Sequence, residues 1–216
     1  GARLSALPLL TAREQQRLIV EWNPPRDDTA GEDVLHALFE AQAVHQPDAV
    51  AVRLDADQLT YAELDARAGR LARRLRACGV GPDSLVGIFL ERSLHMSVAI
   101  LGTMKAGGAV MPLDTTFPAE RLAVMVEDTR PAAVLTLATL RHRLPPMTCS
   151  ILCLDDDEAC GVEPGRRVLA THLACALFTS GSSGRPKAVT MPHRALVNLM
   201  QWQVTRSGLP AGTRTM

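Results

Sequence analysis

Apolar residues recur along this chain in two alternating patterns, short continuous runs and longer stretches with helical spacing. The short runs predict β-strands over 49–54, 84–90, 109–111, 132–137, 150–154, 173–179 and 188–191, with another short strand from Gln58. Helical spacing predicts helices over 10–22, 33–45, 60–78, 93–107, 118–128, 138–143 and 192–206. Because strands alternate with helices, we expect an α/β fold, with a doubly wound, largely parallel sheet and helices on both faces.

Local signals mark the ends of several of these helices. Thr11 and Glu14 have capping-box spacing, and so do Thr60 and Glu63. Gly107-Gly108 follows the almost wholly apolar 93–107 helix, which we expect to be deeply buried. The two glycines predict a tight turn from that helix into the next strand.

The charge balance and the cysteine count narrow the classes of function. Lys+Arg and Asp+Glu both number 23 and aromatic residues make up 3%, so we expect neither a nucleic-acid nor a membrane partner. The arginines of the 60–78 helix predict a solvated helix face rather than an anion-binding patch. No apolar run reaches the ~18–20 residues of a membrane span, and the start lacks a signal-peptide pattern. The five cysteines are an odd number and irregularly spaced, which does not suit a set of disulfides. Together with the missing signal-peptide pattern, they favour a reducing, cytoplasmic location.

Hydroxyl groups, glycines and a lysine gather in the segment that follows the 173–179 strand. Phe178–Lys187 reads FTSGSSGRPK. Glycines let backbone N–H groups converge on an anion, while the hydroxyls and the lysine add further donors, so the segment suits a polyphosphate. A plain surface loop rich in turn residues is the alternative. The segment matches neither a Walker A motif nor a nucleophile elbow, and Cys149 with Cys153 lacks the paired spacing of a zinc site, so no protein metal ligands are predicted.

Three ordered segments carry a resemblance to a known family. Leu173–Lys187 resembles the phosphate-loop signature of adenylate-forming enzymes, and more narrowly that of nonribosomal peptide synthetase adenylation domains. Leu59–Leu64 and Met104–Asp114 resemble the first and second core motifs of those domains, and Thr11–Asn23 resembles the lead-in after a condensation domain. The resemblance implies a linker helix over 1–23. It makes 24–216 the N-terminal part of an adenylation domain, an incomplete subdomain that stops after the phosphate loop.

The resemblance also implies an activity and its partners. The family activates an amino acid with ATP and Mg²⁺ to give an aminoacyl adenylate and pyrophosphate, and then transfers the aminoacyl group to the phosphopantetheine thiol of a carrier domain. Ser183 and Lys187 would be the catalytic residues. The residues that would wrap the β- and γ-phosphates are Thr179, Ser180, Gly181, Ser182, Ser183, Gly184 and Lys187. Neighbouring condensation and carrier domains and the amino acid would be the partners.

The sequence departs from the family pattern at three positions. Ser183 stands where Thr is common and keeps the hydroxyl, whereas Phe178 replaces the usual Tyr and loses a phenolic donor. Ala188 stands where Gly is common; it is harmless if it only starts a strand. We expect Tyr61 and Asp114 to have architectural roles, in helix packing and in a turn.

Two other interpretations stay open. In the family order, the adenine, ribose and amino-acid sites and the C-terminal catalytic lysine lie beyond Met216. The chain alone is therefore expected to be inactive, and a decayed, inert domain with a structural or docking role is one alternative. An acyl-CoA ligase-like enzyme is the other. Trp22 and Trp202 are expected as core or interface anchors, and His193 as a polar residue at a helix start.

Overall fold

The computed structural model describes residues 10–22, 33–156, 165–179, 186–208 and 213, and it divides into two compact units, 1–31 and 32–216. In the first unit, α1 (Ala12–Gln16) continues into the π-helical turn η2 (Arg17–Glu21). The predicted capping box is present, because the Thr11 hydroxyl accepts from the Glu14 N–H and the Glu14 carboxylate accepts from the Thr11 N–H. Trp22 is 63% exposed and is not a core residue of this unit.

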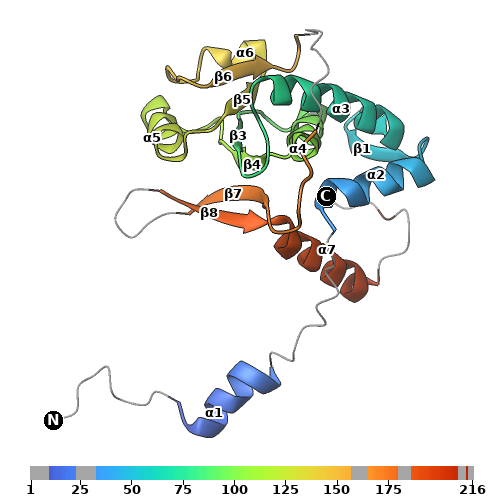
Figure 1. Cartoon of the computed structure of the whole chain (residues 1–216), viewed down its shortest axis with the longest axis vertical. Coiled ribbons are helices and arrows are strands. Elements are labelled where there is room, and N and C mark those ends of the chain that lie inside the picture. Colours follow the sequence, from blue (N-terminus) through green and yellow to red (C-terminus); the bar gives the residue numbers. More distant parts are fainter. Residues whose placement is uncertain (1–9, 23–32, 157–164, 180–185, 209–212, 214–216) are drawn as a thin grey trace, which may run out of the picture. The chain divides into compact units, whose positions relative to one another are not determined.

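A six-stranded sheet organises the second unit (Figure 1). Its strands are β3 (Leu85–Ile88), β4 (Ala109–Pro112), β5 (Ala133–Thr136), β6 (Ser150–Cys153), β7 (Leu173–Thr179) and β8 (Lys187–Pro192). The order is β6-β5-β3-β4-β7-β8, and every neighbouring pair is parallel except β7–β8. From β3 the chain first adds β4 on one side and then β5 and β6 on the other, which confirms the doubly wound, largely parallel sheet.

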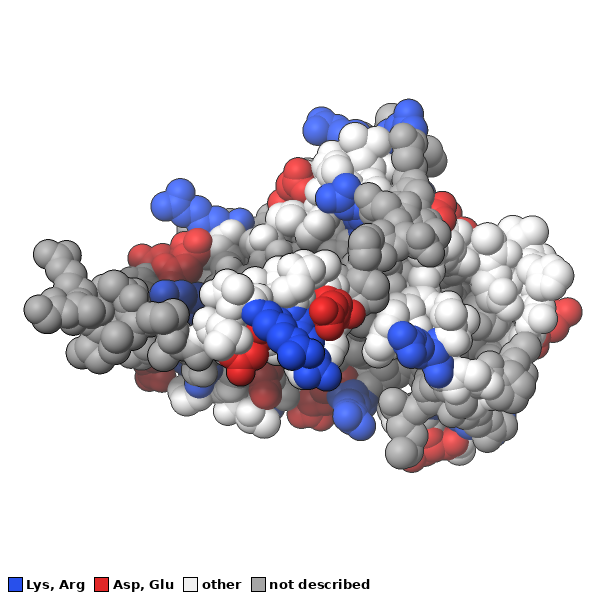
Figure 2. Space-filling model, turned by 90° about the horizontal axis from the view of Figure 1, so that it is seen from below, with Lys and Arg blue, Asp and Glu red and all other residues white. Residues whose placement is uncertain are grey.

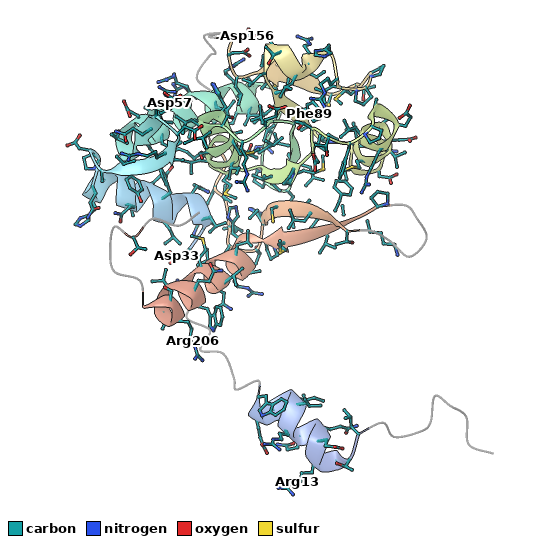
Figure 3. All side chains as sticks on the ribbon, turned by 180° about the vertical axis from the view of Figure 1, so that it is seen from behind. Arg13, Asp33, Asp57, Phe89, Asp156 and Arg206 are labelled. Atoms are coloured by element: carbon teal, nitrogen blue, oxygen red, sulfur yellow. The ribbon has the colours of Figure 1, made fainter. Side chains whose placement is uncertain are left out.

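Helices cover both faces of this sheet. The helices of this unit are α2 (Leu35–His45), α3 (Tyr61–Ala77), α4 (Leu94–Ala106), α5 (Ala119–Thr129), α6 (Ala138–Arg141) and α7 (His193–Ser207), and β1 (Val50–Leu54) forms a small hairpin with β2 (Asp57–Thr60). Side chains of α3 and α4 pack with Val86 and Ile88 on one face of the sheet. Phe89 belongs to the other face, where it packs with side chains of α5 and is fully buried (Figure 3).

The apolar helix α4 is the most deeply buried helix of this unit, as its composition predicts. Seven of its residues are buried, and Gly102 lets α3 approach closely, because a Cβ at Gly102 would lie 2.8 Å from Leu71 Cδ2. Gly107 ends the helix with φ +95°, a left-handed conformation that glycine adopts without strain. The predicted tight turn into β4 is therefore present.

One ammonium group ties α2, α3 and α4 together. Lys105 Nζ lies 2.6 Å from a Glu40 carboxylate oxygen and 2.8 Å from Asp65 Oδ1, with its side chain only 11% exposed. Arg76 adds a hydrogen bond of 2.7 Å from its guanidinium to the Lys105 carbonyl. Two carboxylates thus compensate the one lysine that α4 brings into a mostly buried position.

His193 is the first residue of α7, as the sequence predicts, but its side chain lies in the interior. Its side chain is fully buried, its Nδ1 accepts from the Leu35 N–H at 3.3 Å, and its ring stacks edge-on against His36. Burial, together with the charges of His36 and His172, lowers the pKa of His193 to about 4. Nε2 has no hydrogen-bond partner among the described residues. The imidazole is therefore held neutral at the junction of α2 and α7.

One face of the molecule, drawn in Figure 2, shows no dominant charge. On the face drawn in Figure 2, acidic and basic side chains are interspersed with uncharged ones. Among the described residues, the structure contains no helix with both the length and the apolar character needed to cross a bilayer.

Replacing Gly102 with alanine tests the close approach of α3 and α4. Gly102→Ala should lower the free energy of unfolding by about 1–3 kcal/mol, because the new methyl group overlaps the Leu71 side chain. Gly69→Ala is the matched control, since nothing lies within 4 Å of the position that its new methyl group would take and alanine favours helices by up to about 1 kcal/mol. Denaturant unfolding measures both; equal changes for the two variants would contradict this packing.

Stability should fall on acidification because His193 is buried in its neutral form. Between pH about 6.5 and about 4 the unfolded chain binds a proton that the native state excludes. His193 therefore costs the fold about 1 kcal/mol per pH unit in that window as pH falls. His193→Asn should flatten the pH profile of denaturant unfolding, because asparagine binds no proton in this pH range. An unaltered slope in His193→Asn would refute the assignment.

Candidate functional site

The two described ends of the hydroxyl-rich loop are held side by side by an antiparallel hairpin. Thr179 ends β7 and Lys187 begins β8, the two residues pair in register, and Thr179 Oγ1 donates to the Lys187 carbonyl at 3.4 Å. Both side chains are exposed. Of the predicted phosphate-binding residues, the structure therefore brings Thr179 and Lys187 together. The others lie outside the described residues, namely Ser180, Gly181, Ser182, Ser183 and Gly184.

Strand β7 anchors this hairpin in the core at one end only. Ala174 and Ala176 are fully buried, and the Leu173 N–H donates to Asp83 Oδ1 at 2.9 Å. Leu177 is 43% exposed and pairs with Val189, which is 48% exposed. The sequence indicates a buried strand over the whole of 173–179, and that holds only for its first half. The exposed end of β7 at Thr179 therefore lies at the carboxyl edge of the sheet, where open α/β sheets bind ligands.

The structure settles the role of two of the three departures from the family pattern. Ala188 pairs with Phe178 inside the β-ladder and has no positive φ, so it lies within the first part of β8 and is free of this strain. Phe178 packs against the buried cluster that contains Phe89. The Phe178 ring therefore contributes to the hydrophobic core on the face of the sheet that Phe89 occupies.

Asp114 follows β4, the strand beside β7, and forms a turn as expected. Its Oδ1 accepts from the Thr116 N–H at 2.8 Å and from the Thr116 hydroxyl at 2.7 Å. These hydrogen bonds, the backbone one first, hold the pKa of Asp114 below its usual value. The carboxylate is thus ionised and already engaged within its own loop.

A further pair of charged residues lies at this edge of the sheet and was missed by sequence reasoning. Arg143 lies 3.9 Å from Glu91, which follows β3, and donates to the Thr115 carbonyl after β4. Glu91 could have been found from its place just behind an apolar strand. Arg143 could not, because it comes from an irregular segment with no pattern of its own.

The other motif residues have structural roles. The Tyr61 ring lies 5.4 Å from that of Phe39, and its N–H donates to the Ala49 carbonyl, so it fixes the start of α3 against α2. Burial raises the pKa of the Cys149, Cys153 and Cys175 thiols. These three thiols are therefore protonated at neutral pH and poor nucleophiles.

Comparison with known proteins agrees with this geometry. Residues 39–215 match the AMP-binding enzyme family, and the chain belongs to that family. Within it, the chain is related to adenylation domains of nonribosomal peptide synthetases. It is 42% identical over 215 residues to chondramide synthase cmdD of Chondromyces crocatus, and 40% identical over 217 residues to tyrocidine synthase 3 of Brevibacillus parabrevis. These alignments cover 96% and 99% of this chain.

Solved structures share the fold. The nonribosomal peptide synthetase FmoA3 in its AMPPNP-bound form superposes with a TM-score of 0.80 and 32% identity over 90% of this chain. The N-terminal subdomain of Klebsiella oxytoca NpsA superposes with a TM-score of 0.69 at 22% identity, which shows the fold alone. The chain spans only 5% and 3% of the two synthases named above, 21% of the FmoA3 chain and 45% of the NpsA chain.

Proposed function

We propose that this chain is part of a domain that activates an amino acid with ATP for a nonribosomal peptide synthetase. A carboxylate oxygen of the amino acid attacks the α-phosphorus of ATP, the bond from that phosphorus to the bridging oxygen breaks, and pyrophosphate leaves. The aminoacyl group then passes to a carrier-domain thiol, which forms a thioester and releases AMP. The observation that carries the proposal is the β7–β8 hairpin, which holds Thr179 and Lys187 together at the carboxyl edge of the sheet.

We assign the loop to the β- and γ-phosphates of ATP. The hydroxyl groups of Thr179, Ser180, Ser182 and Ser183 and the backbone N–H groups at Gly181 and Gly184 supply donors for the phosphate oxygens. Lys187 supplies a positive charge at the root of the loop. Such groups orient the nucleotide for in-line attack and stabilise the charge on departing pyrophosphate.

Ser183 and Lys187 are the catalytic residues of this proposal. Mg²⁺ bound with ATP would neutralise part of the phosphate charge. This cation prefers oxygen ligands, and the hydroxyl groups of the loop are ligands of that kind. We place the Ser183 hydroxyl nearest to the phosphates and that cation, in the position where related enzymes commonly have threonine.

We further propose a domain organisation around this chain. Residues 1–23 form a linker helix from an upstream condensation domain, and 24–216 form the first part of the adenylation domain. Phosphopantetheine belongs to a separate carrier domain, and the site of action is the cytoplasm. The alignments to the two synthases support this organisation. The chain spans only 5% and 3% of their lengths, so these relatives are long enough to contain many further domains.

A second candidate is an inert domain with a structural or docking role. Exposed apolar side chains favour it, because they show that these 216 residues leave a surface uncovered among the described elements. On β7, β8 and α7 they are Leu177, Val189, Leu199, Met200, Trp202 and Val204. A surface of that kind suits contact with further protein.

Lys187 provides the sharpest test between the two candidates. In the complete adenylation domain, Lys187→Ala should lower amino-acid-dependent ATP–pyrophosphate exchange by about tenfold to a hundredfold, because one charge that stabilises the departing pyrophosphate is lost. Arg73→Ala on α3 removes a charge elsewhere and should leave exchange within about twofold. Unchanged exchange in Lys187→Ala would remove this residue from the mechanism. Absence of exchange in the parent domain would favour the inert candidate.

Trp202 tests whether α7 packs under further protein. It is 58% exposed here, so Trp202→Ala should change the free energy of unfolding of the 216-residue chain by less than about 1 kcal/mol. In the complete domain the same change should cost about 3 kcal/mol, since a covered tryptophan is lost. Val44→Ala on α2, at a highly exposed site, is the control in both proteins. An equally small effect of Trp202→Ala in both would show that nothing covers this part of α7.

A further inference from the structure

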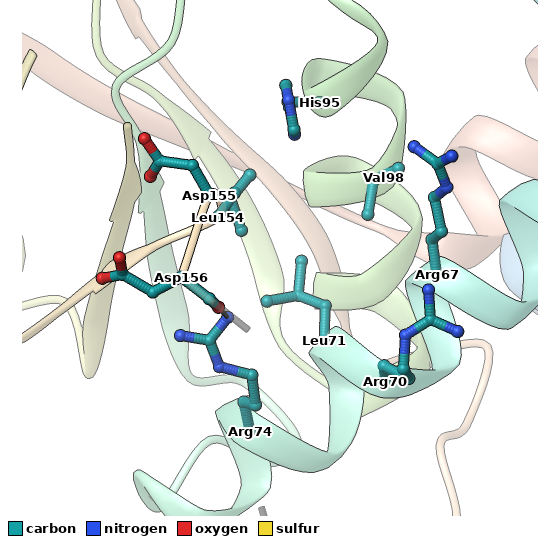
Figure 4. Close-up of a pocket in the computed structure, with 9 residues that line it drawn as sticks. All are labelled: Arg67, Arg70, Leu71, Arg74, His95, Val98, Leu154, Asp155 and Asp156. Carbon is teal, nitrogen blue, oxygen red and sulfur yellow. Dashed lines mark hydrogen bonds between the residues drawn. The ribbon is translucent and has the colours of Figure 1, made fainter. Parts of the chain in front are cut away.

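A pocket of about 390 Å³ lies between α3, α4 and the end of β6 (Figure 4). Its lining combines basic, acidic and apolar side chains, none of which belongs to the phosphate loop. They are Arg67, Arg70, Leu71, Arg74, His95, Val98, Leu154, Asp155 and Asp156. The arginine face of α3, which the sequence predicts to be solvated, therefore also forms one wall of this pocket.

Only one of the three arginines in this wall is engaged by the described part of the protein. Arg74 donates to the Asp156 carbonyl at 2.9 Å and to the Cys153 carbonyl at 3.1 Å, which ties α3 to the end of β6. Arg67 and Arg70 lie one helical turn apart and are exposed. Neither makes a hydrogen bond or salt bridge with another described residue, although Arg67 acts electrostatically on Glu63. Within the described part of the chain, these two guanidinium groups at the rim are thus left unpaired.

The described acidic side chains of the pocket form no salt bridge with either of these two arginines. In Figure 4 the carboxylates of Asp155 and Asp156 lie across the pocket from Arg67 and Arg70 and point away from them. Asp155 accepts from the Ala138 N–H at 3.0 and 3.1 Å and thereby caps the start of α6. His95 lies in the first turn of α4, a helix that begins without a side-chain cap. The positive end of that helix adds to the positive field.

The shape of the lining indicates what kind of anion would fit. Leu71, Val98 and Leu154 give the pocket an apolar floor between its charged walls. Arg67 and Arg70 are separated by about 4.5 Å along the helix axis, so their planar groups can bind two separate carboxylates. An extended peptide places successive residues about 3.3 Å apart and can present two acidic side chains and an apolar one together. A single small anion would use only part of this surface.

We propose that this pocket is a docking site for an acidic peptide segment, with at least two carboxylates and an apolar side chain, from a neighbouring domain of the same multidomain protein. Covalent linkage raises the effective concentration of such a segment, so a weak and salt-sensitive contact is sufficient. The relatives are long enough to provide such neighbours, since the chain spans 5% of chondramide synthase cmdD. The proposal goes beyond amino-acid activation and does not depend on the phosphate loop.

The test uses the 216-residue chain and a fluorescein-labelled peptide, Glu-Leu-Glu-Glu-Leu-Glu, with binding followed by fluorescence anisotropy in low salt. Arg70→Gln should weaken binding by at least about fivefold, and the double variant R67Q/R70Q should weaken it further. Arg73→Gln is the matched control, because it removes the same charge from α3 at a position outside the pocket lining, and it should change affinity by less than about twofold. Equal losses in Arg70→Gln and Arg73→Gln would mean unspecific attraction and would overturn the proposal.

Three further measurements complete the test. A peptide with Gln in place of Glu should not bind, and one with Ser in place of Leu should bind at least about threefold more weakly. Citrate at the same total carboxylate concentration should not displace the labelled peptide; displacement would show a site for bare anions and would overturn the assignment of a peptide. Thermal unfolding of R67Q/R70Q should match that of the unaltered chain, since both arginines are exposed, so a loss of binding reports on the pocket. Absence of binding by the unaltered chain would also refute the proposal.

Discussion

The burial of α4 between the sheet and α3 is the constraint on which the rest of the second unit depends. A helix with seven buried residues has few ways to pack, and Gly102 against Leu71 fixes how closely α3 approaches it. Lys105 then joins three helices through Glu40 and Asp65. Because Gly107 turns the chain directly from α4 into β4, the position of this helix also determines where β4 lies in the sheet.

The candidate site follows from that arrangement. β4 lies between β3 and β7, so it gives β7 a parallel neighbour on one side only, and β8 pairs antiparallel on the other. The first half of β7 is buried and the end near Thr179 is exposed. An anchored base and an exposed end are what a loop needs if it is to offer donors to a large, charged ligand without losing its register. The site therefore depends on packing at a distance from the residues proposed to contact phosphate.

Much of the fold was predictable because its signals are local. Apolar periodicity, the capping boxes at Thr11 and Thr60 and the glycine turn at Gly107 each depend on a few neighbouring residues, and each prediction is confirmed. For the site, the sequence indicated where the loop lies, and the structure adds the hairpin that joins its two ends.

The features that sequence reasoning missed depend on residues far apart in the chain. His193 is buried because α2 supplies Leu35 and His36 to cover it, and nothing near position 193 indicates this. The antiparallel course of β8 and the exposure of Trp202 depend on which elements lie beside them. The basic pocket likewise requires α3, α4 and β6 together, whereas the sequence shows only the arginines of one helix.

We infer that the loop between β7 and β8 binds the phosphates of ATP. Hydrogen–deuterium exchange of the complete adenylation domain, with and without Mg²⁺ and AMPPNP, measures this without relying on catalysis. If the loop binds the phosphates, the nucleotide should slow exchange in peptides covering 179–187 and leave exchange in the α3 peptides around Arg70 unchanged. Saturating nucleotide that protects other segments but leaves exchange over 179–187 unaltered would contradict it.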